Sequence, residues 1–364
     1  MAVPKKNQLV GLDIGSHSIK LAEIEQGKRG RLLKNFGVIE VPRDAIVEDS
    51  IMEIEAAASA IKLLFRNLRV KNRNVAVSLS GYSVIAKKVA LDKIDESEIE
   101  ATIQKEAEKH VPFDINDVNL DFALLSPDDE AEGVALANTE AAISERMGLM
   151  LVAAKKSVID RYLDLIRAAD LNPGVLDVDV FALQNAVEIS VDQPERCHVI
   201  INVGAKELGI NVVSRGESIF SRDSLFGGAM ITEAIMSELT VGFEQAEKIK
   251  LGGVDLDDDG KKGLKKIIVS EVSAWVKEIK RALDFVCATY ADETIGEIIL
   301  CGGSSRIPGF LKYLEMETGI PVRELNPFRN LVIDSAFFDR NYLDYMAPHA
   351  GIAVGLALRS INDK

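Results

Sequence analysis

Two short sequences in this chain could bind phosphate, and they follow one pattern. Asp13 and Gly15 lie between two apolar runs near the start of the chain, and Asn202 and Gly204 lie between two others in the second half. A glycine between two strands lets the backbone approach an anion and point its N–H groups at it. The acidic or amide residue at the strand end can hold a divalent cation through the waters of the ion. The pattern therefore indicates phosphate chemistry assisted by a divalent cation.

Each of these loops alone also fits an ordinary hairpin, because D-x-G and N-x-G are common turn sequences. The matched pair favours a duplicated unit whose two loops enclose one nucleotide. A third loop, Gly302-Gly303-Ser304, directly follows the apolar residues 298–301. Its backbone can lie against a flat or anionic group, and the N-terminus of a following helix adds positive potential. Alone, this third loop is a weak signal.

The positions of these loops depend on the surrounding strands and helices, which the hydrophobic pattern predicts. Strands are expected at residues 9–12, 18–25, 32–41, 75–79, 113–125, 147–153, 175–178, 198–201, 210–213 and 298–301. Helices are expected at residues 51–68, 94–110, 157–169, 182–189, 229–239, 243–251, 267–289 and 347–359. A small α/β segment, which includes an acidic loop at residues 126–132, interrupts the first domain.

Composition limits the classes of function. The 364 residues, of which 47% are hydrophobic, suffice for two domains with substantial cores. The net charge of −14 argues against binding to nucleic acid or to anionic lipid. The three cysteines are far apart and lie in or beside apolar stretches, which indicates reduced thiols without metal-ligand spacing. With no signal region and no bilayer-length apolar run, we expect a cytoplasmic protein.

Taken in order, the three loops resemble the two phosphate motifs and the adenosine motif of the actin, sugar-kinase and heat-shock-chaperone ATPase superfamily. Within it, nearly the whole chain is similar to the PilM family, the actin-like proteins of type IV pilus assembly. The resemblance extends to the residues around Lys20, to Val111-Pro112-Phe113 and to residues 152–155 and 168–176. The division protein FtsA shares the interrupted first domain.

The resemblance implies an α/β, actin-like (ribonuclease H-like) two-domain fold with FtsA-type subdomains. Subdomain 1A would comprise residues 1–82, 165–196 and 346–364, and subdomain 1C residues 83–164. Subdomain 2A would comprise residues 197–226 and 269–345, and subdomain 2B residues 227–268. ATP and Mg²⁺ would bind between the two large domains.

The resemblance also implies roles for single residues. Asp13 and Asn202 would face Mg²⁺ through bound water. The phosphates would contact Gly15, Ser16, Ser18 and Gly204, with Lys20 as a point charge. Gly302, Gly303 and Ser304 would back the adenosine, and Gly227 and Gly228 would lie near the ribose and phosphates. Glu244 and Lys248 would form a polar face near the adenosine, although an exposed i,i+4 salt bridge explains that pair equally well.

Two residues bear on hydrolysis. The family commonly has Asp where this chain has Asn202, which keeps an oxygen for a metal-bound water but contributes no negative charge. Asp179 matches the region from which hydrolytic relatives orient the attacking water, and a plain helix N-cap is the alternative. We therefore expect ATP binding with slow or no hydrolysis.

By the same resemblance, the expected function is that of a nucleotide-bound scaffold. In the family, the partner is the cytoplasmic N-terminal tail of PilN, bound in a groove between subdomains 1A and 1C at the inner-membrane face. Pilus motor ATPases and other copies of the chain are further partners that the family suggests, and membrane contact would be indirect. The alternative is a small-molecule kinase for a sugar or an acid, whose catalytic base would have to be Asp179.

Overall fold

The computed structural model of the protein describes residues 7–43, 45–47, 50–92, 96–125, 146–194 and 196–361. These residues form two five-stranded sheets, a three-stranded sheet and a hairpin of β4 (Ile46–Val47) and β5 (Ser50–Ile51). Within the described part, no helix is long and apolar enough to cross a lipid bilayer. The acidic loop expected at residues 126–132 lies outside the described residues.

The first sheet carries the Asp13 loop. In spatial order its strands are β10 (Asn172–Val178), β6 (Asn74–Leu79), β1 (Val10–Ile14), β2 (Ser18–Gly27) and β3 (Gly30–Glu40). The strands β1, β2 and β3 are antiparallel neighbours, whereas β6 and β10 run parallel to β1. On one face, α1 (Ile54–Asn67) and α5 (Lys156–Ala168) share a core with the sheet, which includes Phe65 and Leu165.

The second sheet repeats this arrangement. Its strands in spatial order are β13 (Glu217–Ser224), β12 (Leu208–Ser214), β11 (His198–Val203), β14 (Glu297–Cys301) and β15 (Val322–Glu324). The first three are antiparallel, and β14 and β15 run parallel to β11. The strand of Asn202 therefore takes the same central place as the strand of Asp13. The helices α9 (Asp258–Thr289) and α10 (Phe310–Thr318) cover one face of this second sheet, where Trp275 packs edge-on against Phe310.

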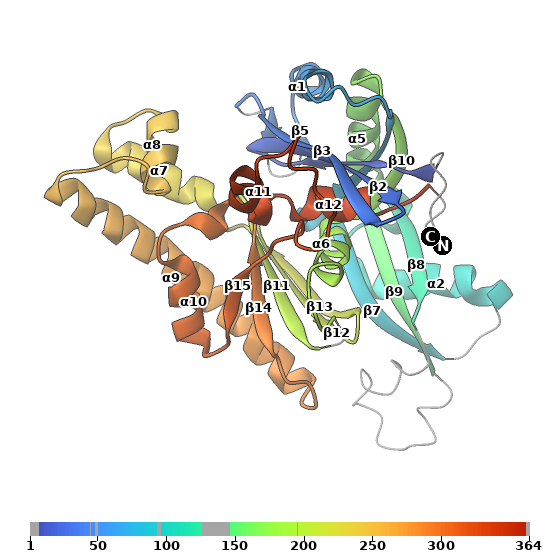
Figure 1. Cartoon of the computed structure of the whole chain (residues 1–364). Coiled ribbons are helices and arrows are strands. Elements are labelled where there is room, and N and C mark those ends of the chain that lie inside the picture. The colour runs from blue at the N-terminus through green and yellow to red at the C-terminus, as the bar shows by residue number, and fades with distance from the viewer. Residues whose placement is uncertain are drawn as a thin grey trace.

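Two helices lie between the sheets and join them, as Figure 1 shows. These are α6 (Asp179–Glu188) and α12 (Gly351–Ala357). Their buried core includes residues of both sheets, among them Ala76 of the first and Ile200 of the second. The two helices approach so closely that a Cβ at Gly355 would lie 1.7 Å from the carbonyl oxygen of Ala182. Backbone contact of this kind leaves no room for a side chain.

A third unit is inserted after β6. It consists of β7 (Val84–Asp92), β9 (Arg146–Lys155) and β8 (Val118–Leu124), which form an antiparallel sheet, and of α2 (Glu96–His110). Its apolar core is its own and includes Ile103 and Leu149. One edge touches the second sheet, because the hydroxyl of Ser221 on β13 donates to the carbonyl of Ala86 on β7 at 3.3 Å. An ion pair of Lys88 and Glu217 at 3.7 Å lies beside this contact.

Several elements differ from the sequence prediction. The long helix α9 starts at Asp258 instead of residue 267, because the Asp257 carboxylate caps it by accepting from the Gly260 N–H at 2.8 Å. The final helix, expected at residues 347–359, is instead a 3₁₀ turn (Ala347–His349) followed by α12, and α11 (Arg340–Met346), which precedes it, was not predicted. Helix α5, of which residues 156–164 were assigned to subdomain 1C, packs on α1 and the first sheet.

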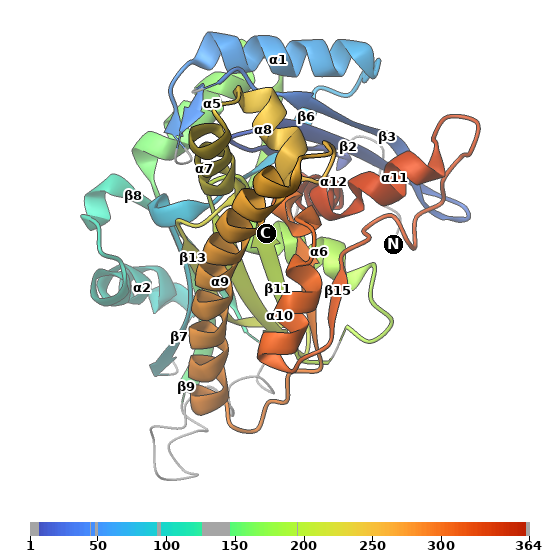
Figure 2. The same ribbon diagram turned by 90° about the vertical axis from the view of Figure 1, so that its left-hand side faces the viewer.

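The remaining helices, α7 (Gly228–Leu239) and α8 (Phe243–Lys250), pack on each other and on the start of α9. Figure 2 shows this helical unit in front of the junction between the two sheets. It corresponds to the segment that was predicted as subdomain 2B.

Substitution Gly355→Ala tests the dependence of the fold on the α6–α12 contact. The added methyl group would overlap the Ala182 carbonyl, so we expect a loss of about 3 kcal/mol in the free energy of unfolding. Gly263→Ala is the matched control, because Gly263 lies inside α9 where a Cβ meets only ordinary contacts beyond 3.4 Å. This control should gain about 0.5–1 kcal/mol through helix propensity. Urea unfolding measures both, and equal stability of the two variants would contradict the packing argument.

Candidate nucleotide-binding site

A cavity of about 310 Å³ lies between the two sheets, next to the ends of α6 and α12. The Asp13 loop, the Asn202 loop and the glycine loop after β14 all line it. Among the predicted site residues, the lining includes Asp13, Gly15, Ser16, Ser18, Lys20, Asp179, Asn202, Gly204, Gly302, Gly303 and Ser304. The structure thus brings together residues that are almost 300 positions apart in the sequence. Gly227, Gly228, Glu244 and Lys248 are not part of this lining.

The Asp13 loop is a tight turn closed by a charge pair. Asp13 at the end of β1 faces Lys20 on β2 in the strand register, and Lys20 Nζ lies 3.2 Å from Asp13 Oδ2. The N–H of Gly15 donates to the Ser18 carbonyl at 3.2 Å, which fixes the turn. Burial raises the pKa of Asp13, and the nearby Lys20 ammonium acts in the opposite direction. The carboxylate is thus buried beside a single cation at the base of the loop.

The Asn202 loop has a different charge arrangement at the matching positions. Asn202 faces Gly209 in the register, so the place of Lys20 is taken by a residue without a side chain. Because that place is empty, the Asp223 side chain of β13 lies over it, with Oδ1 3.1 Å from where a Gly209 Cβ would be. Although Asp223 belongs to β13, two strands from the strand of Asn202, its carboxylate reaches over Gly209 toward Asn202.

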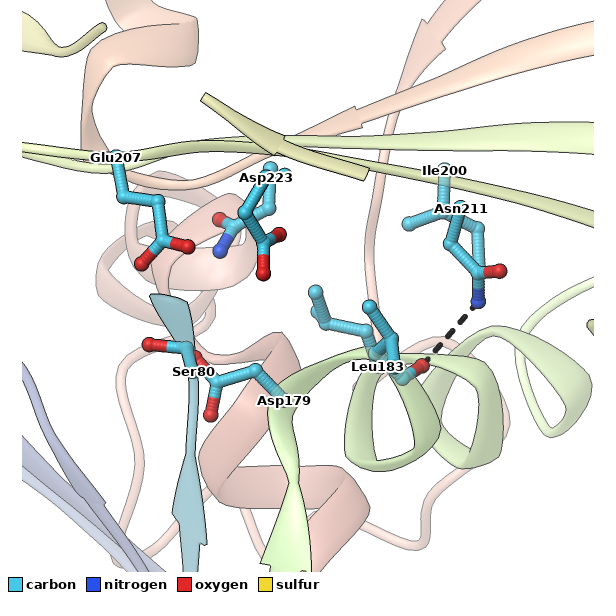
Figure 3. Close-up of a pocket in the computed structure, with 10 residues that line it drawn as sticks. Ser80, Asp179, Leu183, Ile200, Glu207, Asn211 and Asp223 are labelled. Atoms are coloured by element: carbon cyan, nitrogen blue, oxygen red, sulfur yellow. Dashed lines mark hydrogen bonds between the residues drawn. The ribbon is translucent and has the colours of Figure 1, made fainter. Parts of the chain in front are cut away.

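Asp223 also belongs to a small cavity of about 20 Å³ at the floor of the cleft, which shares Asp179, Asn202 and Glu207 with the lining of the larger cavity. Figure 3 shows Glu207, in the loop before β12, and Asp223 of β13 facing Ser80, which follows β6, and Asp179, the first residue of α6. Carboxylates from both domains thus meet next to the predicted magnesium side. Sequence spacing gave no warning of this, because Asp223 approaches through the pairing of three strands and not through a local motif.

The three loops are also bonded to one another. Ser304 Oγ donates to the Gly204 carbonyl at 2.8 Å, and the Gly228 N–H donates to the same carbonyl at 3.0 Å. A Cβ on Gly228 would lie 2.2 Å from Ser304 Oγ, and one on Gly227 would lie 2.3 Å from the Ala205 carbonyl oxygen. Gly227 and Gly228 therefore support the Asn202 loop from behind and do not line the cavity. The Gly302 N–H donates to the Pro348 carbonyl at 2.8 Å, which joins the third loop to the 3₁₀ turn before α12.

Helix α8 presents two charged residues, Glu247 and Lys250, to the cavity, whereas the sequence prediction had named a different pair on the same helix. Lys250 is only 6% exposed, and its Nζ lies 2.6 Å from Glu247 Oε1, 2.9 Å from Thr232 Oγ1 and 3.3 Å from the Gly228 carbonyl. The predicted pair Glu244 and Lys248 is on the exposed side of the same helix. Lys250 lies on the face of α8 that also buries Ala246 and Ile249, and a lysine at such an apolar position was the signal that could have revealed it.

Asp179 lies at the cavity as predicted, but its helix starts earlier than expected. Helix α6 begins at Asp179 itself, and the residue in the N-cap position is Val178. The alternative role of Asp179 as an N-cap three residues before the helix is therefore wrong. Its carboxylate lies at the first helical position, where the helix dipole favours a negative charge.

His349 was not predicted to line the cavity, and its position is unusual for a titratable group. Its Nε2 is buried and has no hydrogen-bond partner among the described residues. Burial lowers the pKa of His349 to about 4, and the positive groups Lys20, Arg306 and His17 act in the same direction. The imidazole is therefore neutral at physiological pH.

Two similar sheets around a cleft lined by glycine loops are the features of an actin-like protein. Solved structures support this class: the chain aligns with the EutJ ethanolamine utilization protein of Carboxydothermus hydrogenoformans at a TM-score of 0.58 and 14% identity, over 98% of this chain and 91% of that one. The family model described as type IV pilus assembly protein PilM matches residues 11–361. The chain therefore belongs to the PilM family, and the predicted actin-like fold is confirmed.

Two further relatives agree with this assignment. A solved structure titled PilM-PilN type IV pilus biogenesis complex aligns at a TM-score of 0.82 and 27% identity, over 98% of this chain and 99% of that one. The cell division protein FtsA of Enterococcus faecalis is 22% identical over 345 residues, which are 84% of this chain and 76% of FtsA. This chain is thus a type IV pilus assembly protein of the actin-like class.

The buried His349 predicts acid sensitivity of the fold. Because its pKa is about 4 in the folded protein and 6.5 in a free side chain, the unfolded chain binds more protons between these pH values. The free energy of unfolding therefore falls as the pH drops through this window, by about 2–3 kcal/mol near pH 4.5. Urea titrations near pH 7 and pH 4.5 should show a smaller loss for His349→Gln than for wild type. Equal losses would show that His349 is not held neutral.

Proposed function

We propose that this protein binds ATP with Mg²⁺ in the cleft between its two sheets and, in that state, presents a surface to the cytoplasmic N-terminal tail of PilN. The observation that carries the nucleotide part is the convergence of three glycine loops on one cavity. The partner part is supported by family membership and by the similarity to a protein solved in complex with PilN.

The cavity fits a nucleotide in size and chemistry. Its volume of about 310 Å³ is at the lower end of the range of small-molecule sites, about 300–1,000 Å³. At Gly302 a Cβ would lie 2.4 Å from the Val203 carbonyl oxygen and 2.6 Å from Asn202 Oδ1, so this glycine lets the third loop pack directly against the Asn202 loop at the cavity. In this proposal Gly15, Ser16, Ser18, Lys20 and Gly204 hold the phosphates, and Gly302 to Ser304 back the adenosine.

For the magnesium ion, the proposed ligands are waters held by Asp13 and Asn202. Asp13 is buried beside Lys20, so it has a carboxylate oxygen that a hydrated cation would stabilise. Asn202 contributes only a neutral oxygen, and Asp223 is the carboxylate next to it. For the adenosine, Glu247 and Lys250 replace Glu244 and Lys248 as the proposed contacts from α8, because only the former pair lines the cavity.

We further propose slow turnover of the nucleotide. Asp179 lies at the cavity, where it could orient water, but the neutral Asn202 gives weaker charge balance for the metal than a second aspartate would. A protein that holds ATP for long periods suits a scaffold better than a transferase. Family membership also favours the scaffold over the small-molecule kinase.

The proposed partner site lies between the first-sheet unit and the inserted unit of β7, β8, β9 and α2. Binding of a membrane protein's tail there would recruit this chain to the inner-membrane face without membrane contact of its own. Pilus motor ATPases and other copies of the chain remain further proposed partners.

Calorimetry with a synthetic PilN tail peptide tests the central proposal. Wild type should bind Mg-ATP and should bind the peptide with an affinity that depends on the nucleotide. Asp13→Ala removes the buried carboxylate at the metal side, so we expect its Mg-ATP affinity to fall at least about tenfold. Peptide binding without nucleotide serves as the control for a folded variant.

The outcomes separate the alternatives. If wild type binds neither peptide nor ATP while a sugar or acid acceptor stimulates ADP formation, the scaffold proposal is wrong and a kinase is right. If Asp13→Ala binds Mg-ATP as tightly as wild type, the assignment of the metal side is wrong.

A second test compares two lysines of α8, one buried at the cavity and one exposed on the helix surface. Lys250→Met removes the buried ammonium at the cavity, and we expect the ATP affinity to fall about tenfold because the Glu247 carboxylate loses its partner there. Lys248→Met changes an exposed residue of the same helix and should leave the affinity within about twofold of wild type. Titration with a fluorescent ATP analogue measures both. Equal affinities for the two variants would show that α8 does not contact the nucleotide.

A further inference from the structure

Three side chains from separate segments meet at the mouth of the nucleotide cavity. They are His17 of the loop between β1 and β2, Arg43 of the segment after β3, and Phe243, the first residue of α8. The ring centroids of His17 and Phe243 are 6.0 Å apart, and Arg43 Cζ lies 5.5 Å from the centroid of Phe243. All three line the cavity. The Phe243 ring is thus contacted by a second ring, that of His17, and by the guanidinium of Arg43 over its face. Both contacts are favourable for an aromatic ring.

This contact joins the two halves of the molecule at a place separate from the packed helices α6 and α12. His17 and Arg43 belong to the first-sheet unit, whereas Phe243 belongs to the helical unit of α7 and α8 that packs on the second half. Because the contact consists of side chains at a partly exposed position, it can open without disturbing a core. The α6–α12 contact cannot open in this way, because it is buried backbone packing.

Both sides of the contact are connected to groups that would touch a nucleotide. On the first side, the Val41 N–H donates to the His17 carbonyl at 3.0 Å, which ties the segment of Arg43 to the phosphate loop. On the second side, Phe243 lies about one helical turn before Glu247, which pairs with Lys250 at the cavity wall. A ligand that orders the phosphate loop and α8 would therefore hold the two partners of Phe243 in place.

We propose that Phe243, held between His17 and Arg43, is a latch that closes the cleft over a bound nucleotide and sets the rate of its release. The proposal rests on the nucleotide-binding function proposed above. The nucleotide leaves only when the ring separates from its two partners. Loss of the ring should therefore accelerate release and leave the phosphate loops intact.

Stopped-flow release of a methylanthraniloyl-ATP analogue with Mg²⁺, chased by excess ATP, tests this latch. We expect Phe243→Ala to release the analogue about tenfold faster than wild type, a change that corresponds to about 1.4 kcal/mol. Phe243→Tyr keeps the ring and should release at nearly the wild-type rate. Glu244→Ala is the matched control, because it changes the next residue, which is exposed and outside the cavity lining.

A cross-link provides the opposite perturbation. Arg43→Cys and Phe243→Cys, in a Cys287→Ser background that removes the exposed natural thiol, can be joined by a short bismaleimide. Cross-linking after loading should slow release strongly, whereas the unlinked double variant should release faster than wild type. Equal release rates for wild type, Phe243→Ala and the cross-linked protein would overturn the latch alone. Failure of wild type to bind the analogue at all would overturn the nucleotide proposal and the latch together.

Discussion

The close backbone packing of α6 against α12 fixes how the two sheets lie relative to each other. The two helices separate the sheets, and their shared core contains residues from both. Gly355 allows this approach to Ala182, and Gly11 does the same for β1, where a Cβ would lie 2.0 Å from the Ala353 carbonyl oxygen. Since the Asp13 loop extends from β1 and Asp179 begins α6, their distance from the Asn202 loop is set by this packing. A side chain at either glycine would move one wall of the cleft relative to the other.

The repeated sheet also shows how a duplicated unit can diverge without losing its geometry. Strand order and loop position are the same in both copies. In the first, an acid and a lysine face each other across neighbouring strands, whereas in the second an amide faces a glycine. The free space over that glycine admits Asp223. In the second copy the nearby carboxylate therefore comes from β13 and not from the strand that carries Asn202.

Much of this could be predicted from the sequence, and the failures have physical causes. The loops at Asp13, Asn202 and Gly302 were found because a glycine after an apolar strand is a local pattern. The wrong charged pair was assigned on α8, because helical spacing defines a face only when its direction toward a neighbour is known. The packing of α8 on α7 decides that direction. Asp223 was missed because its role follows from strand pairing. The start of α9 was missed because a capping aspartate in a charged stretch resembles a solvated loop.

The strand β13 contacts two separate parts of the molecule, the cleft and the inserted unit. Near one end it offers Asp223 to the floor of the cleft, and further along it touches β7 of the inserted unit through Ser221 and Glu217. The backbone of β13 is hydrogen-bonded to β12 over the whole strand, so it moves with the second sheet. Any movement of the second sheet relative to the first must therefore either carry the inserted unit with it or break the Ser221 and Glu217 contacts. The chain attaches the inserted unit to the first domain, but these side-chain contacts also attach it to the second.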